Sequence, residues 1–336
     1  MGVTGLMKYI IRYGNSCPIT ERIVGKTIRN TRVIYLDAIS KLIEIYHQYM
    51  NDNIYPKTYE SLFQYEVKKF TLYLIKISYY KRTVNVFIDY HFDDNVSVDD
   101  IIFREYLPEP TDEYKDKDEN EWFNYLMKVK SREHKSELRK KCVENEIDGT
   151  YEDNIFRLLI HNINDFVFKL RGDPALANVT FYGCSIEADF AIAKHIVTYN
   201  KNVCPIVITT DTDLLALLCD VDCILKFLMG KHTYFVNPVE FWQKVFGTTL
   251  SPVVIKMLCI MKGVDYNIVD TGIKIYRFGD ILGILHINTF DELTEDRLYA
   301  YICEYLEKNK DKPETQYTAI AINLYINDME SSFYEI

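Results

Sequence analysis

The sequence predicts an α/β protein with a mostly parallel central sheet flanked by helices. Three short runs rich in β-branched and aromatic residues, at 33–36, 84–88 and 206–209, are predicted to be buried strands, and stretches of helical length separate them. Strands that alternate with helices are typical of a parallel sheet covered by helices. Each run leads into acidic residues, and in such sheets the ligand site lies beyond the C-terminal strand ends.

The predicted elements follow one another closely outside one interruption. In chain order they are a short helix at 3–14, a strand at 33–36, helices to residue 49 and over 58–80, a strand at 84–88, a helix at 152–170, a strand at 179–182, a helix from 185 to 199, and strands at 206–209 and near 223–228. In the 58–80 helix, regularly spaced apolar residues predict one buried face: Leu62, Tyr65, Phe70, Leu74 and Ile77. A loop is expected after the last strand.

Residues 93–150 interrupt the alternation of strands and helices. An acidic run over 93–121 is followed by a basic run over 128–141, and Pro108 and Pro110 lie in the acidic part. We predict an insertion with one basic helix near 121–145. The chain therefore divides into four predicted segments: an N-terminal region at 1–92, the insertion at 93–150, an internal α/β region at 151–237, and a mainly helical region at 238–336.

Composition bounds the class of protein. The 336 residues, 48% of them hydrophobic, suffice for a full core and exclude disorder across the chain. No window reaches the run of about 18 apolar residues that a membrane helix needs, and no signal peptide is visible, so we expect an intracellular protein without membrane contact. The eight cysteines form no CxxC pair, which predicts reduced, buried thiols. The net charge of −10 argues against coating nucleic acid by charge alone.

Acidic residues gather where the predicted strands end or the following helices begin. They are Asp37, Asp89, Glu187, Asp189, Asp211, Asp213 and Asp265. One acid after a strand is commonly a helix N-cap, but capping does not explain five such segments. Crowded carboxylates repel, so they need a compensating cation, and oxygen-only ligands favour Mg²⁺ or Mn²⁺ over zinc. Two such ions about 4 Å apart would clamp the oxygens of a phosphoryl displacement, which predicts phosphodiester hydrolysis.

The motifs around these acids resemble those of the flap endonuclease/XPG family of structure-specific 5′ nucleases. The matching segments, in the family's order over residues 1–280, are Met1-Gly2-Val3-Thr4-Gly5-Leu6, Val33-Ile34-Tyr35-Leu36-Asp37-Ala38, Val86-Phe87-Ile88-Asp89, Ile186-Glu187-Ala188-Asp189, Thr209-Thr210-Asp211-Thr212-Asp213-Leu214-Leu215 and Gly263-Val264-Asp265-Tyr266. The resemblance implies a PIN-like 5′-nuclease fold in which 93–150 is a helical arch. It also implies that all seven acids are catalytic and together bind two Mg²⁺ ions, with Mn²⁺ as a substitute.

Three stretches depart from the family pattern. Val96 stands where the arch is expected to carry a base, which leaves Arg104 as the nearby cation, and Ile43 stands where a stacking tyrosine is expected, with Tyr46 one turn further on. The family's Gly-Ile-Gly-Pro-Lys hairpin is Gly272-Ile273-Lys274-Ile275-Tyr276 here, so its grip on duplex DNA is expected to differ. For the basic run over 128–141, the alternative to contact with DNA is an ordinary solvated surface. The residues expected to bind DNA are Gly2, Arg104, Lys128, Lys130, Arg132, Lys135, Arg139, Lys140, Gly272 and Lys274.

The expected function is that of a divalent-metal-dependent, structure-specific DNA endonuclease with 5′–3′ exonuclease activity. Flapped or branched DNA is the expected partner, together with replication or recombination proteins, and the oligomeric state stays open. The divergent arch and hairpin resemble the FEN-like nucleases of large DNA viruses such as poxviruses and iridoviruses, which implies action in the host cytoplasm or nucleus. Two alternatives remain: a 5′–3′ exoribonuclease-like enzyme, and a non-catalytic junction-binding scaffold of the same fold.

Overall fold

The computed structural model describes two compact units, and each is treated by itself. The described residues are 3, 5–14, 31–52, 58–79, 82–89, 163–184, 188–199, 203–229, 232–264, 275–309, 318, 321–322, 325–326 and 333–335. The sheet unit comprises Thr27–Lys115, Arg139–Thr209 and Ser331–Ile336. The helical unit comprises Met1–Lys26, Asp116–Leu138 and Thr210–Glu330. The four segments predicted from the sequence remain a prediction.

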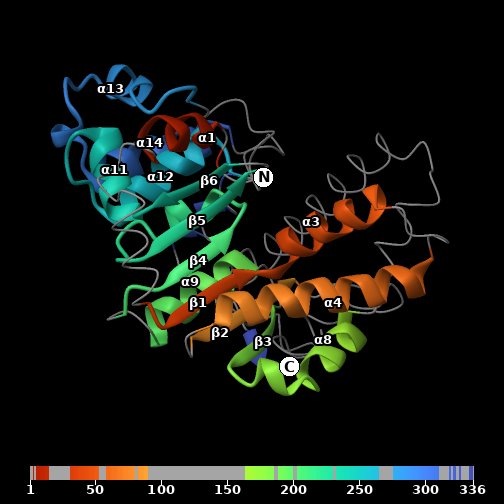
Figure 1. Ribbon diagram of the computed structural model, residues 1–336. Coiled ribbons are helices and arrows are strands. Elements are labelled where there is room, and N and C mark those ends of the chain that lie inside the picture. Colours follow the sequence, from red (N-terminus) through yellow and green to blue (C-terminus); the bar gives the residue numbers. More distant parts are fainter. Residues whose placement is uncertain are drawn as a thin grey trace, which may run out of the picture. The chain divides into compact units, whose positions relative to one another are not determined.

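Four parallel strands form the centre of the sheet unit, in the order β4-β1-β2-β3, and the antiparallel strand β7 pairs with β3 (Figure 1). Their bounds are β1 Val33–Asp37, β2 Thr83–Asp89, β3 Val179–Cys184, β4 Ile206–Thr209 and β7 Phe333–Glu335. In the register, Asp37 lies opposite Phe87 and Asp89 lies opposite Cys184. The mostly parallel sheet predicted from the apolar runs is confirmed.

Helices pack on both the strands and one another in the sheet unit. They are α3 Ala38–Asn51, α4 Tyr59–Ser78, α8 Ile163–Arg171, the 3-10 turn η3 Pro174–Leu176, and α9 Ala188–Tyr199. Figure 1 shows α3 and α4 as an adjacent pair. Helix α4 begins with a capping box, in which the side chains of Thr58 and Ser61 each accept a hydrogen bond from the other residue's backbone amide. The buried stripe of α4 contains Glu66 rather than the expected Tyr65, whose hydroxyl instead donates to Asp52.

The helical unit contains a β-hairpin and most of the helices of the C-terminal region. Its elements are α1 Leu6–Tyr9, the π-turn η1 Ile10–Gly14, α10 Asp213–Leu217, β5 Ile224–Met229, β6 His232–Val236, α11 Pro238–Phe246, α12 Pro252–Lys262, α13 Asp280–Ile284, η4 Phe290–Glu292 and α14 Glu295–Lys308. Asn237, Ser251 and Thr294 cap the three longer helices through their side chains. Trp242 and Phe246 stack at the centre of the aromatic core, and each meets Phe278 edge-on.

Several expectations need correction. The loop expected after the strand near 223–228 is wrong over 232–236, because β6 forms there and pairs antiparallel with β5. Cys303 is exposed and Cys204 is half-buried, whereas Cys184, Cys219, Cys223 and Cys259 are buried free thiols as expected. Among the described helices, none is both long and apolar enough to cross a membrane. The insertion at 93–150, with its basic helix, lies outside the described residues.

Candidate metal centre

The C-terminal ends of the parallel strands place acidic residues at one edge of the sheet. Asp37 is the last residue of β1, and Asp89 is the last residue of β2. Asp189 lies in the first turn of α9, which follows β3 along the chain, and Asp211 comes two residues after β4. Because neighbouring parallel strands all end at the same edge, these positions share one side of the fold.

The Asp37 carboxylate is held by hydroxyl groups rather than used as a helix cap. Asp37 occupies the N-cap position of α3, yet its side chain makes no capping hydrogen bond. Instead its Oδ2 accepts from Ser40 Oγ at 2.8 Å and from Thr209 Oγ1 at 3.4 Å. The latter contact joins the end of β1 to the end of β4. The capping explanation therefore fails at this position, and the carboxylate is oriented by two neutral donors.

The Asp211 and Asp213 carboxylates occupy a tight turn between β4 and α10. The amide of Asp213 donates to Asp211 Oδ1 at 2.9 Å, which closes the turn. Asp213 is 2% exposed, and its Oδ2 accepts a hydrogen bond from the Tyr325 hydroxyl. Tyr325 is itself buried. Sequence reasoning did not identify Tyr325, and as one tyrosine among 27 it carries no pattern that could have singled it out.

Asp189, Asp211 and Asp213 form a group that fits a divalent cation. One carboxylate oxygen from each lies within 4.8 Å of the others, and Asp189 and Asp213 are buried. Three negative oxygens at that spacing repel one another in a buried setting, and a hard cation removes the repulsion. The donors are all oxygen atoms, which is the chemistry that Mg²⁺ and Mn²⁺ prefer. The residues present therefore fit the implied metal.

The structure describes no side chain for the remaining predicted site residues. For Asp89 only the backbone is described, at the end of β2. The other members lie outside the described residues: Glu187, Asp265, Gly2, Arg104, Lys128, Lys130, Arg132, Lys135, Arg139, Lys140, Gly272 and Lys274. On α3, Tyr46 is buried and contacts the ring of His47, while Ile43 is 39% exposed. Its burial makes Tyr46 a packing residue rather than an exposed stacking platform.

Among the comparisons with known proteins, only the one with solved structures finds proteins that are similar to this chain. No family model and no curated protein matches the chain. Two structures of the catalytic core of Rad2 in complex with DNA substrate, complexes II and III, are similar to it. Each shares 12% sequence identity, and the match covers 93% of this chain and 86% of theirs, with TM-scores of 0.43 and 0.44. A similarity at this level carries no argument about activity.

Proposed function

We propose that the chain is a divalent-metal-dependent, structure-specific DNA endonuclease with 5′–3′ exonuclease activity. The observation that carries the proposal is the group of carboxylates from Asp189, Asp211 and Asp213, which follow the parallel strands β3 and β4 along the chain. The ordered acidic motifs of the sequence, with their resemblance to the flap endonuclease/XPG family, support it. Flapped or branched DNA, in replication, repair or recombination, is the proposed substrate.

The described residues have distinct roles in this proposal. Asp189, Asp211 and Asp213 would hold one Mg²⁺ ion, with Mn²⁺ as a substitute. On the sequence pattern, the set for two ions is completed by Asp37, Asp89, Glu187 and Asp265. A bound cation supplies the charge that activates a water molecule and stabilises the negative charge developing on the phosphate. The Tyr325 hydroxyl donates to Asp213 Oδ2 and so orients that carboxylate for a cation. Ser40 does the same for Asp37.

To bind the negatively charged phosphate backbone of DNA, the protein needs positively charged side chains, and the three described carboxylates supply none. We propose that the basic run over 128–141 provides them, because it concentrates Lys and Arg in a chain of net charge −10. The run lies outside the described residues, so this contact rests on the sequence alone.

A cleavage assay tests the proposed function. Labelled flap, nicked, gapped, Holliday-junction and RNA substrates are incubated with Mg²⁺, with Mn²⁺ and with EDTA. We expect cleavage of branched DNA with either metal and none in EDTA, and Asp211→Asn should lower the rate by about 10²-fold or more. Asp165→Asn, which changes an exposed aspartate on α8, is the matched control and should leave the rate unchanged.

The outcomes separate the alternatives. Cleavage confined to RNA would identify an exoribonuclease-like enzyme. Binding to junctions without cleavage in any metal would identify a scaffold. An Asp211→Asn rate within threefold of the unmodified chain would contradict the metal centre assigned here.

A further inference from the structure

The segment from Ile275 to Asp280, which includes the last two residues of the predicted hairpin, has its backbone held at successive residues. The Ile275 amide donates to the carbonyl of Met261 at 2.9 Å, and the Arg277 amide donates to Asp280 Oδ2 at 2.8 Å. Ile275 and Phe278 are each 2% exposed and anchor the segment in the core. A proline at 275, where the family pattern has one, would lack the amide that makes the first of these bonds. The backbone of this segment is therefore held by a hydrogen bond that a proline at position 275 could not donate.

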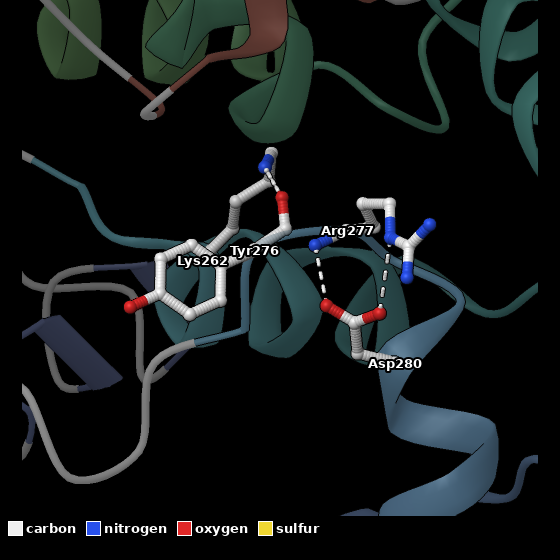
Figure 2. Close-up of polar contacts among 4 residues, drawn as sticks. All are labelled: Lys262, Tyr276, Arg277 and Asp280. Carbon is white, nitrogen blue, oxygen red and sulfur yellow. Dashed lines mark hydrogen bonds and ion pairs between the residues drawn. The ribbon is translucent and has the colours of Figure 1, made fainter.

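Lys262, the last residue of α12, fixes the carbonyl between those two amides. Its Nζ donates to the Tyr276 carbonyl oxygen at 2.6 Å (Figure 2), although the residue is only 5% exposed. The ammonium also lies 5.8 Å from the ring centroid of Tyr9 and 5.5 Å from that of Phe278. Burying an ammonium is costly unless such partners compensate it. Here the hydrogen bond to the Tyr276 carbonyl and the two aromatic rings compensate the cost of burial. The buried charge in turn holds one exposed segment in place.

The two residues at the middle of the fixed segment face solvent. The Tyr276 residue and the Arg277 side chain are each 82% exposed. Figure 2 shows the Tyr276 ring and the Arg277 guanidinium extending away from each other. Arg277 pairs with Asp280 through Nε at 3.3 Å, which orients the guanidinium, and the Arg277 amide lowers the pKa of Asp280, so the partner stays charged. An aromatic ring and a cation are thus presented from adjacent positions of one backbone that hydrogen bonds hold in place.

We propose that Tyr276 and Arg277 form a nucleic-acid contact in which the Tyr276 ring stacks on an unpaired nucleotide and the Arg277 guanidinium contacts a neighbouring phosphate. The inference rests on the proposed function and narrows its substrate to DNA with unpaired nucleotides, such as a gap. A base inside a duplex has both faces covered by its neighbours, so an exposed ring can stack on an unpaired base but not on a base within a duplex. A protein-docking patch needs continuous apolar surface, whereas the exposed neighbour of Tyr276 is a charged arginine.

Equilibrium binding in EDTA tests the contact without cleavage. The two ligands are a duplex containing a short single-stranded gap with a purine analogue whose fluorescence is quenched on stacking, and a continuous duplex of the same sequence. Tyr276→Ala should weaken binding to the gapped ligand about tenfold and remove the quenching, while Tyr276→Phe keeps both. Binding to the continuous duplex should change by less than about twofold with either variant, because duplex bases offer no free face.

Two further variants sharpen the measurement. Arg277→Gln should weaken binding to both ligands and lower the slope of the salt dependence by about one unit, as the loss of one phosphate contact requires. Tyr299→Ala removes another exposed tyrosine of the helical unit, 55% exposed on α14, and should change neither ligand. Equal binding by Tyr276→Ala and the unmodified chain, or equal weakening of both ligands, would overturn the stacking contact. If the unmodified chain cleaves branched DNA in Mg²⁺, only this inference then fails; if it neither binds nor cleaves DNA, both proposals fail.

Discussion

Two buried carboxyl groups of this protein differ in their hydrogen bonds and in their neighbours. Asp213 is 2% exposed and receives a hydrogen bond from Tyr325, and its own amide closes the turn onto Asp211. Glu66 is fully buried in α4, in line with Leu62 and Phe70, and among the described residues neither of its oxygens has a hydrogen-bond partner. Burial raises the pKa of Glu66 to about 9, and the charge of Lys41 offsets only part of that rise.

The contrast separates a carboxyl group that receives a hydrogen bond beside two other carboxylates from one that receives none among the described residues. The Tyr325 hydroxyl donates to Asp213 Oδ2 and orients that carboxylate toward Asp189 and Asp211, as a cation site needs. Lys41, the cation that acts on Glu66, pairs with Glu44 at 2.7 Å and lies over the Tyr73 ring, so it does not pair with Glu66. The Glu66 carboxyl is then protonated in the folded protein at neutral pH. Burial alone therefore does not identify a functional acid, whereas burial beside other carboxylates and a hydrogen-bond donor does.

The largest expected effect is on catalysis, in Asp213→Asn. The amide still accepts from Tyr325 but removes one of three converging charges, so cleavage should fall by about 10²-fold or more while the fold is retained. The measurement is the single-turnover cleavage rate with Mg²⁺, together with the melting temperature. Glu66→Gln is the comparator and should cleave at a rate within threefold of the unmodified chain. Equal losses in both variants would remove the distinction between the two carboxyl groups.

The second prediction concerns the pH dependence of stability. A carboxyl group whose pKa rises on folding stabilises the folded state fully below its ordinary pKa of 4.5, and this contribution is lost as the pH rises towards about 9. Glu66→Gln has no such proton, so its free energy of unfolding relative to the unmodified chain should rise by about 3 kcal/mol between pH 5 and pH 8. Urea unfolding at several pH values measures this difference.

Glu60→Gln is the matched control for that experiment. Glu60 is an exposed glutamate in the first turn of the same helix, so its substitution should change stability by about 0.5 kcal/mol and leave the pH dependence in place. A pH slope that persists unchanged in Glu66→Gln would show that Glu66 is ionised in the folded protein.

How far the sequence predicts these features depends on whether a pattern repeats. The acids at the strand ends were predictable because buried strands are short, apolar and regularly followed by carboxylates, as at Asp37 and Asp211. The β6 strand was missed, although Gly230 and Lys231 between two apolar runs are a two-residue hairpin signal. Glu66 lies four residues from both Leu62 and Phe70, so helical spacing alone could have placed it in the buried stripe.

Other features carry no signal in the sequence. Tyr325 reaches Asp213 across 112 positions, and only tertiary packing brings the two together. The three residues of β7 are too few to show a period, and their strand forms because β3 offers an edge for pairing. The support of Tyr276 by Lys262 is likewise invisible, since a lysine at a helix end is ordinarily solvated.

The third prediction tests the donor to Asp213. Tyr325→Phe removes one hydroxyl and keeps the ring, so the cost is that of one hydrogen bond to a charged group, and cleavage should slow by about tenfold. Because the hydroxyl acts through Asp213, the Mg²⁺ concentration for half-maximal rate should rise as well. A slower rate with an unchanged Mg²⁺ dependence would mean that Tyr325 acts on the fold and not on the cation site.

The smallest effect distinguishes hydroxyl groups with and without partners between α3 and α4. The Tyr73 hydroxyl is buried without a hydrogen-bond partner among the described residues, and burial raises its pKa, whereas the Tyr49 hydroxyl bonds Ser61 Oγ. Tyr73→Phe should therefore be neutral or stabilise by up to about 1 kcal/mol, and Tyr49→Phe should destabilise by about 1 kcal/mol. Urea unfolding of both variants at pH 7 gives the comparison. The same loss of stability in both would mean that partners do not decide the worth of a buried polar group in this helix pair, and the contrast between Glu66 and Asp213 would need another cause.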